Sequence, residues 1–210
     1  GSLALASVMA GPPKLPPIGD VAPLDFPEVQ TATLANGIRV FLARRTSVPL
    51  VSVRVSFDAG RAADPPSAPG TGALLLELMD EGTANLDSSA LARTKERLGV
   101  QLSGFAGPDH TAFQLDALVP NLAPSLQLLS DYIRRPTLAP AELERVRAQQ
   151  LAQIGNELKA PGSIARRTLL PILYGPGHPY AVGSATGSAA TVGKLTRDDL
   201  VRFHDAWYRP

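Results

Sequence analysis

The chain has 210 residues, enough to bury a hydrophobic core of its own, and 44% of them are hydrophobic. Its formal net charge of +1 gives no electrostatic reason to expect nucleic acid or an acidic membrane surface as a partner. The sequence contains no cysteine, which excludes disulfides, thiolate metal sites and cysteine nucleophiles.

The first 29 residues predict an extended lead-in. Residues 11–27 are rich in proline, which favours extended backbone over packed elements. Before them, Leu3–Ala10 is apolar but too short to span a bilayer, and Val8-x-Ala10 resembles a signal-cleavage site. An export remnant and an interdomain linker both fit this segment, and the first indicates an exported or periplasmic bacterial protein. We therefore divide the chain into a lead-in over 1–29 and a single domain over 30–210.

The domain is expected to begin with β-structure. Thr31–Leu34 and Ile38–Arg44 flank Asn36-Gly37, a pair favoured in tight hairpin turns. Leu50–Ala59 then alternates valine or phenylalanine with polar residues, which predicts a half-buried strand.

Helices dominate the rest of the chain. They are predicted over Thr71–Glu81, Ser88–Leu98, Pro124–Arg134, Ala141–Lys159, Ser163–Tyr174 and, from a capping box at Thr196–Asp199, on to Trp207. Two further strands are expected over Gln101–Phe105 and Thr111–Leu118, around the turn residues Gly107-Pro108-Asp109. The segment 175–193 is glycine-rich and predicted to be irregular. Paired strands followed by runs of helices indicate an α+β fold, with a mostly antiparallel sheet packed against a layer of helices.

The apolar side chains of the predicted helices suggest which faces are buried. Thr71–Glu81 is apolar almost all round, which is typical of a deeply buried helix, and Gly82 is suited to its left-handed C-terminal position. Later helices carry apolar stripes at near-helical spacing: Leu126, Leu129 and Ile133, then Leu143, Val146, Leu151, Ile154 and Leu158.

The segment from Gly70 to Thr83 has the form of a metallopeptidase helix without its ligands. In the H-x-x-E-H signature, two histidines on one helical face bind zinc and the glutamate acts as general base. On this segment the three positions fall on Ala73, Leu76 and Glu77. An alanine methyl group has no lone pair to donate to a metal, and a leucine side chain cannot accept a proton from water.

Other segments, in the same order, extend the similarity. They are Leu34–Val40, Val51–Gly60, and a tail from Gly175 to Pro210 that contains Gly177-His178-Pro179-Tyr180 and Trp207-Tyr208-Arg209-Pro210. The chain thus resembles the pitrilysin/insulinase/mitochondrial-processing-peptidase family of zinc metallopeptidases, the inverzincins. The resemblance places the third zinc ligand of the family, a glutamate, at Gln153, whose neutral amide is a poor zinc ligand. It also implies that the domain is truncated at its C-terminal end.

The resemblance implies a degenerate, non-catalytic domain. Such domains pair with an active zinc peptidase domain, either in a tandem repeat of the same chain or in a heterodimer, and the pair encloses a chamber that binds unfolded peptides. On this interpretation zinc belongs only to the partner, and this chain holds no cofactor. Two alternatives remain open: an active metallopeptidase with a rebuilt metal site that includes Glu77, and a purely structural scaffold subunit.

Two expectations concern side chains of the degenerate site. In the family, the edge strand beside the zinc helix pairs with substrate backbone, which makes Leu102, Ser103, Gly104, Phe105 and Ala106 the candidate peptide-binding residues. We also expect Glu77 to approach Gln153 across the vacated site, because an unpaired buried carboxylate is costly. The three histidines, His110, His178 and His204, are not expected to converge on a metal ion.

Overall fold

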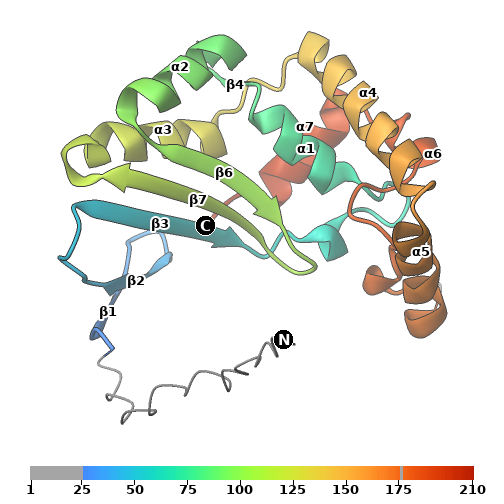
Figure 1. Cartoon of the computed structure of the whole chain (residues 1–210), viewed down its shortest axis with the longest axis horizontal. Coiled ribbons are helices and arrows are strands. Elements are labelled where there is room, and N and C mark those ends of the chain that lie inside the picture. Colours follow the sequence, from blue (N-terminus) through green and yellow to red (C-terminus); the bar gives the residue numbers. More distant parts are fainter. Residues whose placement is uncertain (1–25, 176) are drawn as a thin grey trace, which may run out of the picture. The chain divides into compact units, whose positions relative to one another are not determined.

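The computed structural model describes residues 26–175 and 177–210 (Figure 1). The chain divides into two compact units, Gly1–Arg45 and Thr46–Pro210, and each is described by itself. The signal-like segment Leu3–Ala10 lies outside the described residues. The division into a lead-in over 1–29 and a domain over 30–210 therefore stays a prediction.

The first unit contains a β-hairpin. Strand β1 (Val29–Thr33) pairs antiparallel with β2 (Arg39–Ala43), and the pairing runs from Val29 opposite Ala43 to Thr33 opposite Arg39. The connecting turn holds Asn36, whose side-chain Oδ1 accepts a hydrogen bond from the amide of Ile38 at 3.3 Å. The hairpin predicted around Asn36-Gly37 is confirmed.

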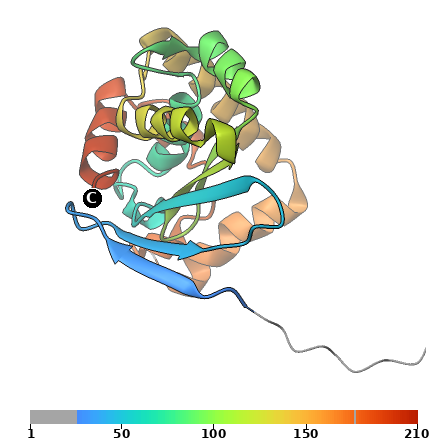
Figure 2. The ribbon, with the colours of Figure 1, turned by 90° about the vertical axis from the view of Figure 1, so that its left-hand side faces the viewer.

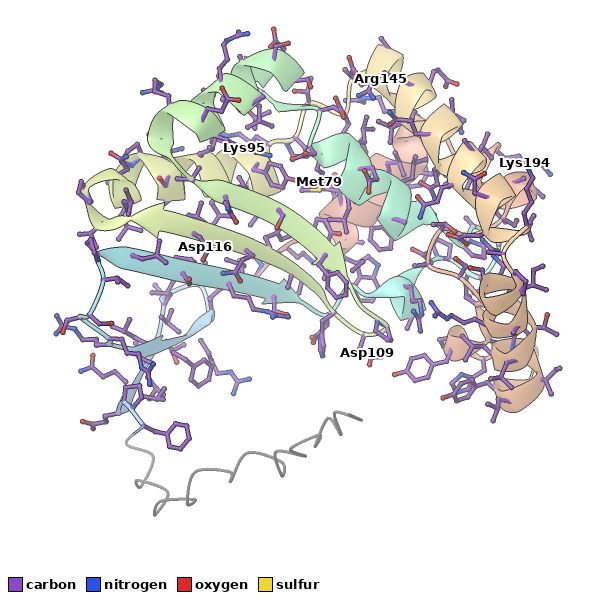
Figure 3. All side chains as sticks on the ribbon, in the orientation of Figure 1. Met79, Lys95, Asp109, Asp116, Arg145 and Lys194 are labelled. Carbon is purple, nitrogen blue, oxygen red and sulfur yellow. The ribbon has the colours of Figure 1, made fainter. Side chains whose placement is uncertain are left out.

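The second unit contains a three-stranded antiparallel sheet in the order β3-β7-β6. Its strands are β3 (Leu50–Phe57), β6 (Gln101–Ala106) and β7 (Thr111–Leu118). Exposure alternates along β3 between valine or phenylalanine and polar residues, so the predicted half-buried strand is confirmed. The turn between β6 and β7 carries Asp109 at its tip (Figure 3). Within the described residues of this unit, β6 forms an edge of the sheet.

Helices of the second unit pack against this sheet, and α2, α3 and α7 lie on the same side of β3 (Figure 2). The α-helices are α1 (Thr71–Met79), α2 (Ser88–Leu98), α3 (Leu122–Arg134), α4 (Pro140–Glu157), α5 (Pro161–Tyr174), α6 (Ala189–Val192) and α7 (Arg197–Trp207). The 3-10 turns are η1 (Arg61–Ala63), η2 (Val119–Asn121) and η3 (Pro179–Ala181). The predicted α+β fold is confirmed. None of the helices within residues 26–175 and 177–210 is both long enough and apolar enough to cross a membrane.

The core of this unit is centred on α1, as its sequence predicts. Leu74, Leu75, Leu78 and Met79 have no exposed surface, and α1 contacts α4, α7 and β6. Each such side chain stabilises the fold by about 1.5–3 kcal/mol through burial. The packing of these side chains therefore fixes the position of α1, independently of the residues at its polar positions.

The structure corrects several details of the predicted elements. Helix α1 ends at Met79, and Gly82 is not its cap but begins β4 (Gly82–Thr83), which pairs with β5 (Leu86–Asp87). Long-range backbone pairing decides this, because Ala84 donates to the carbonyl of Arg135 at 2.7 Å. Leu126 and Leu158, assigned to buried stripes, are 40% and 55% exposed. The segment 175–193, predicted to be irregular, contains η3 and α6.

Candidate functional site

Helix α1 starts at a point fixed by a buried carboxylate. Asp64 accepts hydrogen bonds from the amides of Gly70 at 2.7 Å and Gly72 at 2.8 Å, two of the donors left unpaired at a helix N-terminus. Burial raises the pKa of Asp64 to about 6, and the hydrogen bonds from Gly72, Gly70 and Thr71 lower it by less. The amides and the helix dipole thus offset part of the cost of burying this carboxylate at the N-terminus of α1.

A cavity of about 300 Å³ lies between α1 and the edge strand β6. It is lined by Ala73, Leu76, Glu77, Asp80, Leu102, Ser103, Gly104, Phe105, Ala106, Tyr132 and Ala185. The structure thus brings the three degenerate signature positions together with all five candidate peptide-binding residues. Their role in binding a peptide stays a prediction.

Leu76 packs against the backbone of β6 at Gly104. A Cβ atom added to Gly104 would lie 2.8 Å from Leu76 Cδ2 and 3.2 Å from the ring of Phe113. A hydrocarbon side chain therefore covers the strand at the position that the signature assigns to a general base. Leu76 has no group that could take a proton from water, so it cannot supply that step.

The two carboxylates that line this cavity, those of Glu77 and Asp80, differ in their ion pairing. Asp80 forms an ion pair with Lys95 Nζ at 2.6 Å, and Lys95 also lies 5.5 Å from the centre of the Tyr132 ring. Burial first, and then the neighbouring Asp80, raises the pKa of Tyr132, so its hydroxyl stays protonated. Glu77 is exposed and belongs to no ion pair within the described residues.

The predicted approach of Glu77 to Gln153 was wrong. Gln153 instead donates to Glu157 Oε1, one turn further along α4, at 3.4 Å. The residues that the structure describes show no hydrogen bond between Glu77 and Gln153. The expectation assumed a buried Glu77, whereas water solvates the exposed carboxylate and removes the need for a protein partner.

Sequence inspection missed a cluster of polar side chains that joins α4, α5 and the loop 183–188. Glu157 Oε2 accepts hydrogen bonds from Arg167 Nη2 at 2.6 Å, Arg167 Nε at 3.2 Å, Ser184 Oγ at 2.9 Å and Thr186 Oγ1 at 3.1 Å. Burial raises the pKa of Glu157, but the hydrogen bonds from Arg167, Ser184 and Thr186 outweigh it, so the pKa lies below its ordinary value. We call these four residues the Glu157 cluster.

A second contact fixes the same loop to the start of α1. Gln150 is 4% exposed and donates to the carbonyls of Thr186 at 2.8 Å and Gly70 at 3.4 Å. Gly70 and Gly187 have φ angles of 97° and 73°, and a side chain on Gly187 would overlap the carbonyl of Pro69. The loop and the helix therefore meet backbone to backbone.

The sequence contained a signal for this arrangement. Gln150, Gln153 and Glu157 recur at i, i+3 and i+7, which places them on one face of α4. A polar stripe on an otherwise amphipathic helix indicates partners on that side. Its members proved to differ in burial, since Gln150 is buried and Gln153 is exposed.

Within residues 26–175 and 177–210, no group of three or more His, Asp or Glu side chains could hold a metal ion. The histidines instead make separate contacts. His110 pairs with Asp58 at 2.9 Å, His178 Nδ1 accepts from the amide of Tyr180 at 3.1 Å, and His204 Nε2 lies 2.7 Å from the carbonyl oxygen of Ile133.

Comparison with known proteins tests the resemblance directly. The sequence profile of the family described as Insulinase (Peptidase family M16) matches residues 39–175, more than half of the chain. The chain belongs to peptidase family M16. The match includes α1, β6 and α4, and so covers the degenerate signature positions, the candidate peptide-binding strand and Gln153.

Curated relatives of this M16 chain are named as subunits of larger assemblies. Cytochrome b-c1 complex subunit 1 of Bos taurus is 30% identical over 186 residues, covering 87% of this chain and 38% of that protein. The alpha subunit of the mitochondrial-processing peptidase of Solanum tuberosum is 26% identical over 203 residues, covering 87% of this chain and 39% of that protein. The M16 chain thus spans less than half the length of these relatives.

Solved structures agree with the fold. The structure described as a peptidase M16 inactive domain from Pseudomonas fluorescens has a TM-score of 0.80 and 31% identity, covering 84% of this chain and 43% of that one. A protease from Helicobacter pylori has a TM-score of 0.81 at 21% identity, covering 89% of this chain and 45% of that one, and supports the fold alone.

Proposed function

We propose that this M16 domain binds an extended peptide along β6 without cutting it, and so assists an active zinc peptidase domain or subunit. The observation that carries the proposal is the edge strand, which lines a cavity with Ala73 and Leu76 where metal ligand and base would stand. An edge strand offers unpaired backbone donors and acceptors to a further strand, the arrangement called β-augmentation.

Catalysis by a partner is the second part of the proposal. Ala73, Leu76 and Gln153 cannot together hold and activate zinc, so on this proposal zinc belongs to the partner and none to this chain. The names of relatives as alpha and beta subunits of a peptidase support a paired arrangement. The likeness to a structure described as an inactive M16 domain supports the loss of chemistry.

Backbone pairing has a specific experimental signature. In a β-ladder only alternate residues of a peptide direct their N–H groups towards the neighbouring strand. An unstructured, fluorescently labelled peptide is therefore prepared in two forms, with N-methyl groups on its even or on its odd amides. We expect one form to lose most of its affinity for the chain in anisotropy titrations and the other to keep it.

Equal affinity of both methylated forms would rule out backbone pairing, and so would the absence of binding by the parent peptide. Hydrolysis of the same peptide by the chain alone, abolished by a chelator, would instead favour an active enzyme with a rebuilt metal site. The relatives named as subunits of the cytochrome b-c1 complex favour a further candidate, a scaffold subunit without peptide contact. Stable assembly with a partner and no peptide binding would identify that role.

A further inference from the structure

A second cavity, of about 410 Å³, lies between the segment 61–69, helix α5 and the loop 177–188. Its volume falls within the range of small-ligand sites, roughly 300–1,000 Å³. It adjoins the cavity beside β6, since Ser184 lines the one and Ala185 the other. All these residues belong to the unit Thr46–Pro210.

Arg61 belongs to this cavity, and its side chain forms no ion pair within the described residues. Its backbone is fixed, because its amide donates to the carbonyl of Gly107 at 3.0 Å. Arg61 lines the cavity, and its Nε atom is buried with no acceptor among the described residues. A guanidinium group never loses its proton in proteins, so this buried donor cannot escape its cost by titrating.

The other charged groups of the cavity are already paired. Arg167 is held by Glu157 and by the carbonyl of Gly187. Asp64 directs its two carboxylate oxygens to the amides of Gly70 and Gly72. Arg61 thus remains the cation of this cavity without a counter-ion in residues 26–175 and 177–210.

We propose that this cavity binds a carboxylate of the peptide that lies on β6, through the guanidinium of Arg61. This proposal rests on the proposed function and adds a chemical group, a carboxylate, that the bound peptide carries. Arg61 is bonded to Gly107, the residue that directly follows β6, so a peptide that continues past Ala106 reaches this cavity. Planar guanidinium and carboxylate groups match as paired hydrogen-bonding forks, which explains an arginine at this position.

The direction of the peptide decides which carboxylate arrives. A peptide parallel to β6 has its C-terminal end beyond Ala106 and presents its terminal carboxylate. An antiparallel peptide has its N-terminal end there and presents an aspartate or glutamate side chain. Both sources offer the same group to Arg61.

Four peptides of otherwise equal sequence separate these sources: a free C-terminus without acidic residues, its C-terminal amide, and two amidated forms with glutamate or glutamine near the N-terminus. Their dissociation constants are measured for the wild-type chain, for R61Q and for R61K, which keeps the charge without the fork. R54Q is the matched control, because Arg54 is an exposed arginine of β3 that does not line the cavity.

We expect R61Q to weaken the binding of one carboxylate peptide by about tenfold or more and to leave the two amidated peptides without an acidic residue unchanged. The affinity of R61K for that carboxylate peptide should lie between those of wild type and R61Q, and the affinity of R54Q should match that of wild type. Equal wild-type affinities for all four peptides would overturn the carboxylate site while leaving the proposed function intact. An equal loss for all four peptides in R61Q would reduce Arg61 to a structural role. Absence of binding by every peptide would overturn the proposed function and this inference together.

Discussion

The Glu157 cluster predicts a large effect for a small change, the substitution Glu157→Gln. Glutamine keeps the shape of the side chain but removes the charge and replaces one acceptor oxygen by a donor. Arg167, Ser184 and Thr186 all donate to Glu157 Oε2. The substitution therefore leaves these donors one acceptor oxygen in place of a carboxylate, and leaves the charge of Arg167 uncompensated.

The magnitude follows from the burial of the pair. Removing one partner of a fully buried ion pair costs about 3–5 kcal/mol, whereas an exposed pair contributes about 0–1 kcal/mol. The side chains of Arg167 and Glu157 are 17% and 21% exposed, so solvent screens them in part. We expect Glu157→Gln to lower the free energy of unfolding by about 2 kcal/mol, between these limits.

Urea denaturation followed by circular dichroism measures the change. With a slope of about 2 kcal/mol/M, the midpoint should fall by roughly 1 M. The matched control is Glu142→Gln on the same helix, because Glu142 pairs with Arg145 at 2.8 Å in a more exposed position. That control should cost less than about 1 kcal/mol. Glu157→Gln combined with Arg167→Gln should cost less than the sum of the single changes.

The pH dependence provides a second test. Burial raises the pKa of Glu157, but its hydrogen bonds lower it further, so its folded pKa lies below the ordinary value. Its contribution to stability is therefore present above the ordinary glutamate pKa and is lost as pH falls through the folded value.

Equal urea midpoints for Glu157→Gln and Glu142→Gln at neutral pH, or strictly additive costs in the double variant, would refute the role assigned to the Glu157 cluster.

Three further predictions concern other parts of the structure. Burial raises the pKa of Asp64 from 3.8 to about 6, so its contribution to stability, largest below pH 3.8, should fall by about 3 kcal/mol as pH rises to 6. The stability difference between wild type and D64N, measured across this range, should shrink in that direction, and a constant difference would contradict it. G104A should lower the free energy of unfolding by about 1–2 kcal/mol, because the new methyl group crowds Leu76 Cδ2 and the Phe113 ring. The loss should be smaller in an L76A background. If calorimetry gives the same loss in both backgrounds, this contact is excluded. T196A should cost about 1 kcal/mol by removing the side chain that accepts from the amide of Asp199, and an unchanged melting temperature would argue against the cap.

Sequence patterns predicted correctly those elements that depend on residues close together in the chain. The alternation over 50–57, the Asn36-Gly37 turn and the capping box at Thr196 each depend on neighbouring residues, and the structure confirms them. The early end of α1 at Met79 was not predictable in this way. Gly82 is taken by β4, whose neighbour Ala84 bonds to Arg135 from a distant part of the chain.

The candidate site was predictable in position but not in its contacts. The degenerate motif and the strand 102–106 could be placed from the sequence, and they line one cavity. Helical periodicity does not fix the rotation of α4 to within one residue position, so Gln150 and Gln153 could not be told apart. Arg61 gave no signal at all, because a lone arginine in a proline-rich segment has the pattern of an ordinary loop.

The contact between Gly70 and Gly187 bears on how such a domain can change over evolutionary time. Both residues approach the opposite segment with backbone atoms, and a side chain on either would collide with a carbonyl group. The close approach itself is made by backbone atoms, so it does not depend on the side chains further along α1. Substitutions at positions 73, 76 and 77, which line the cavity beside β6, therefore leave this backbone contact in place.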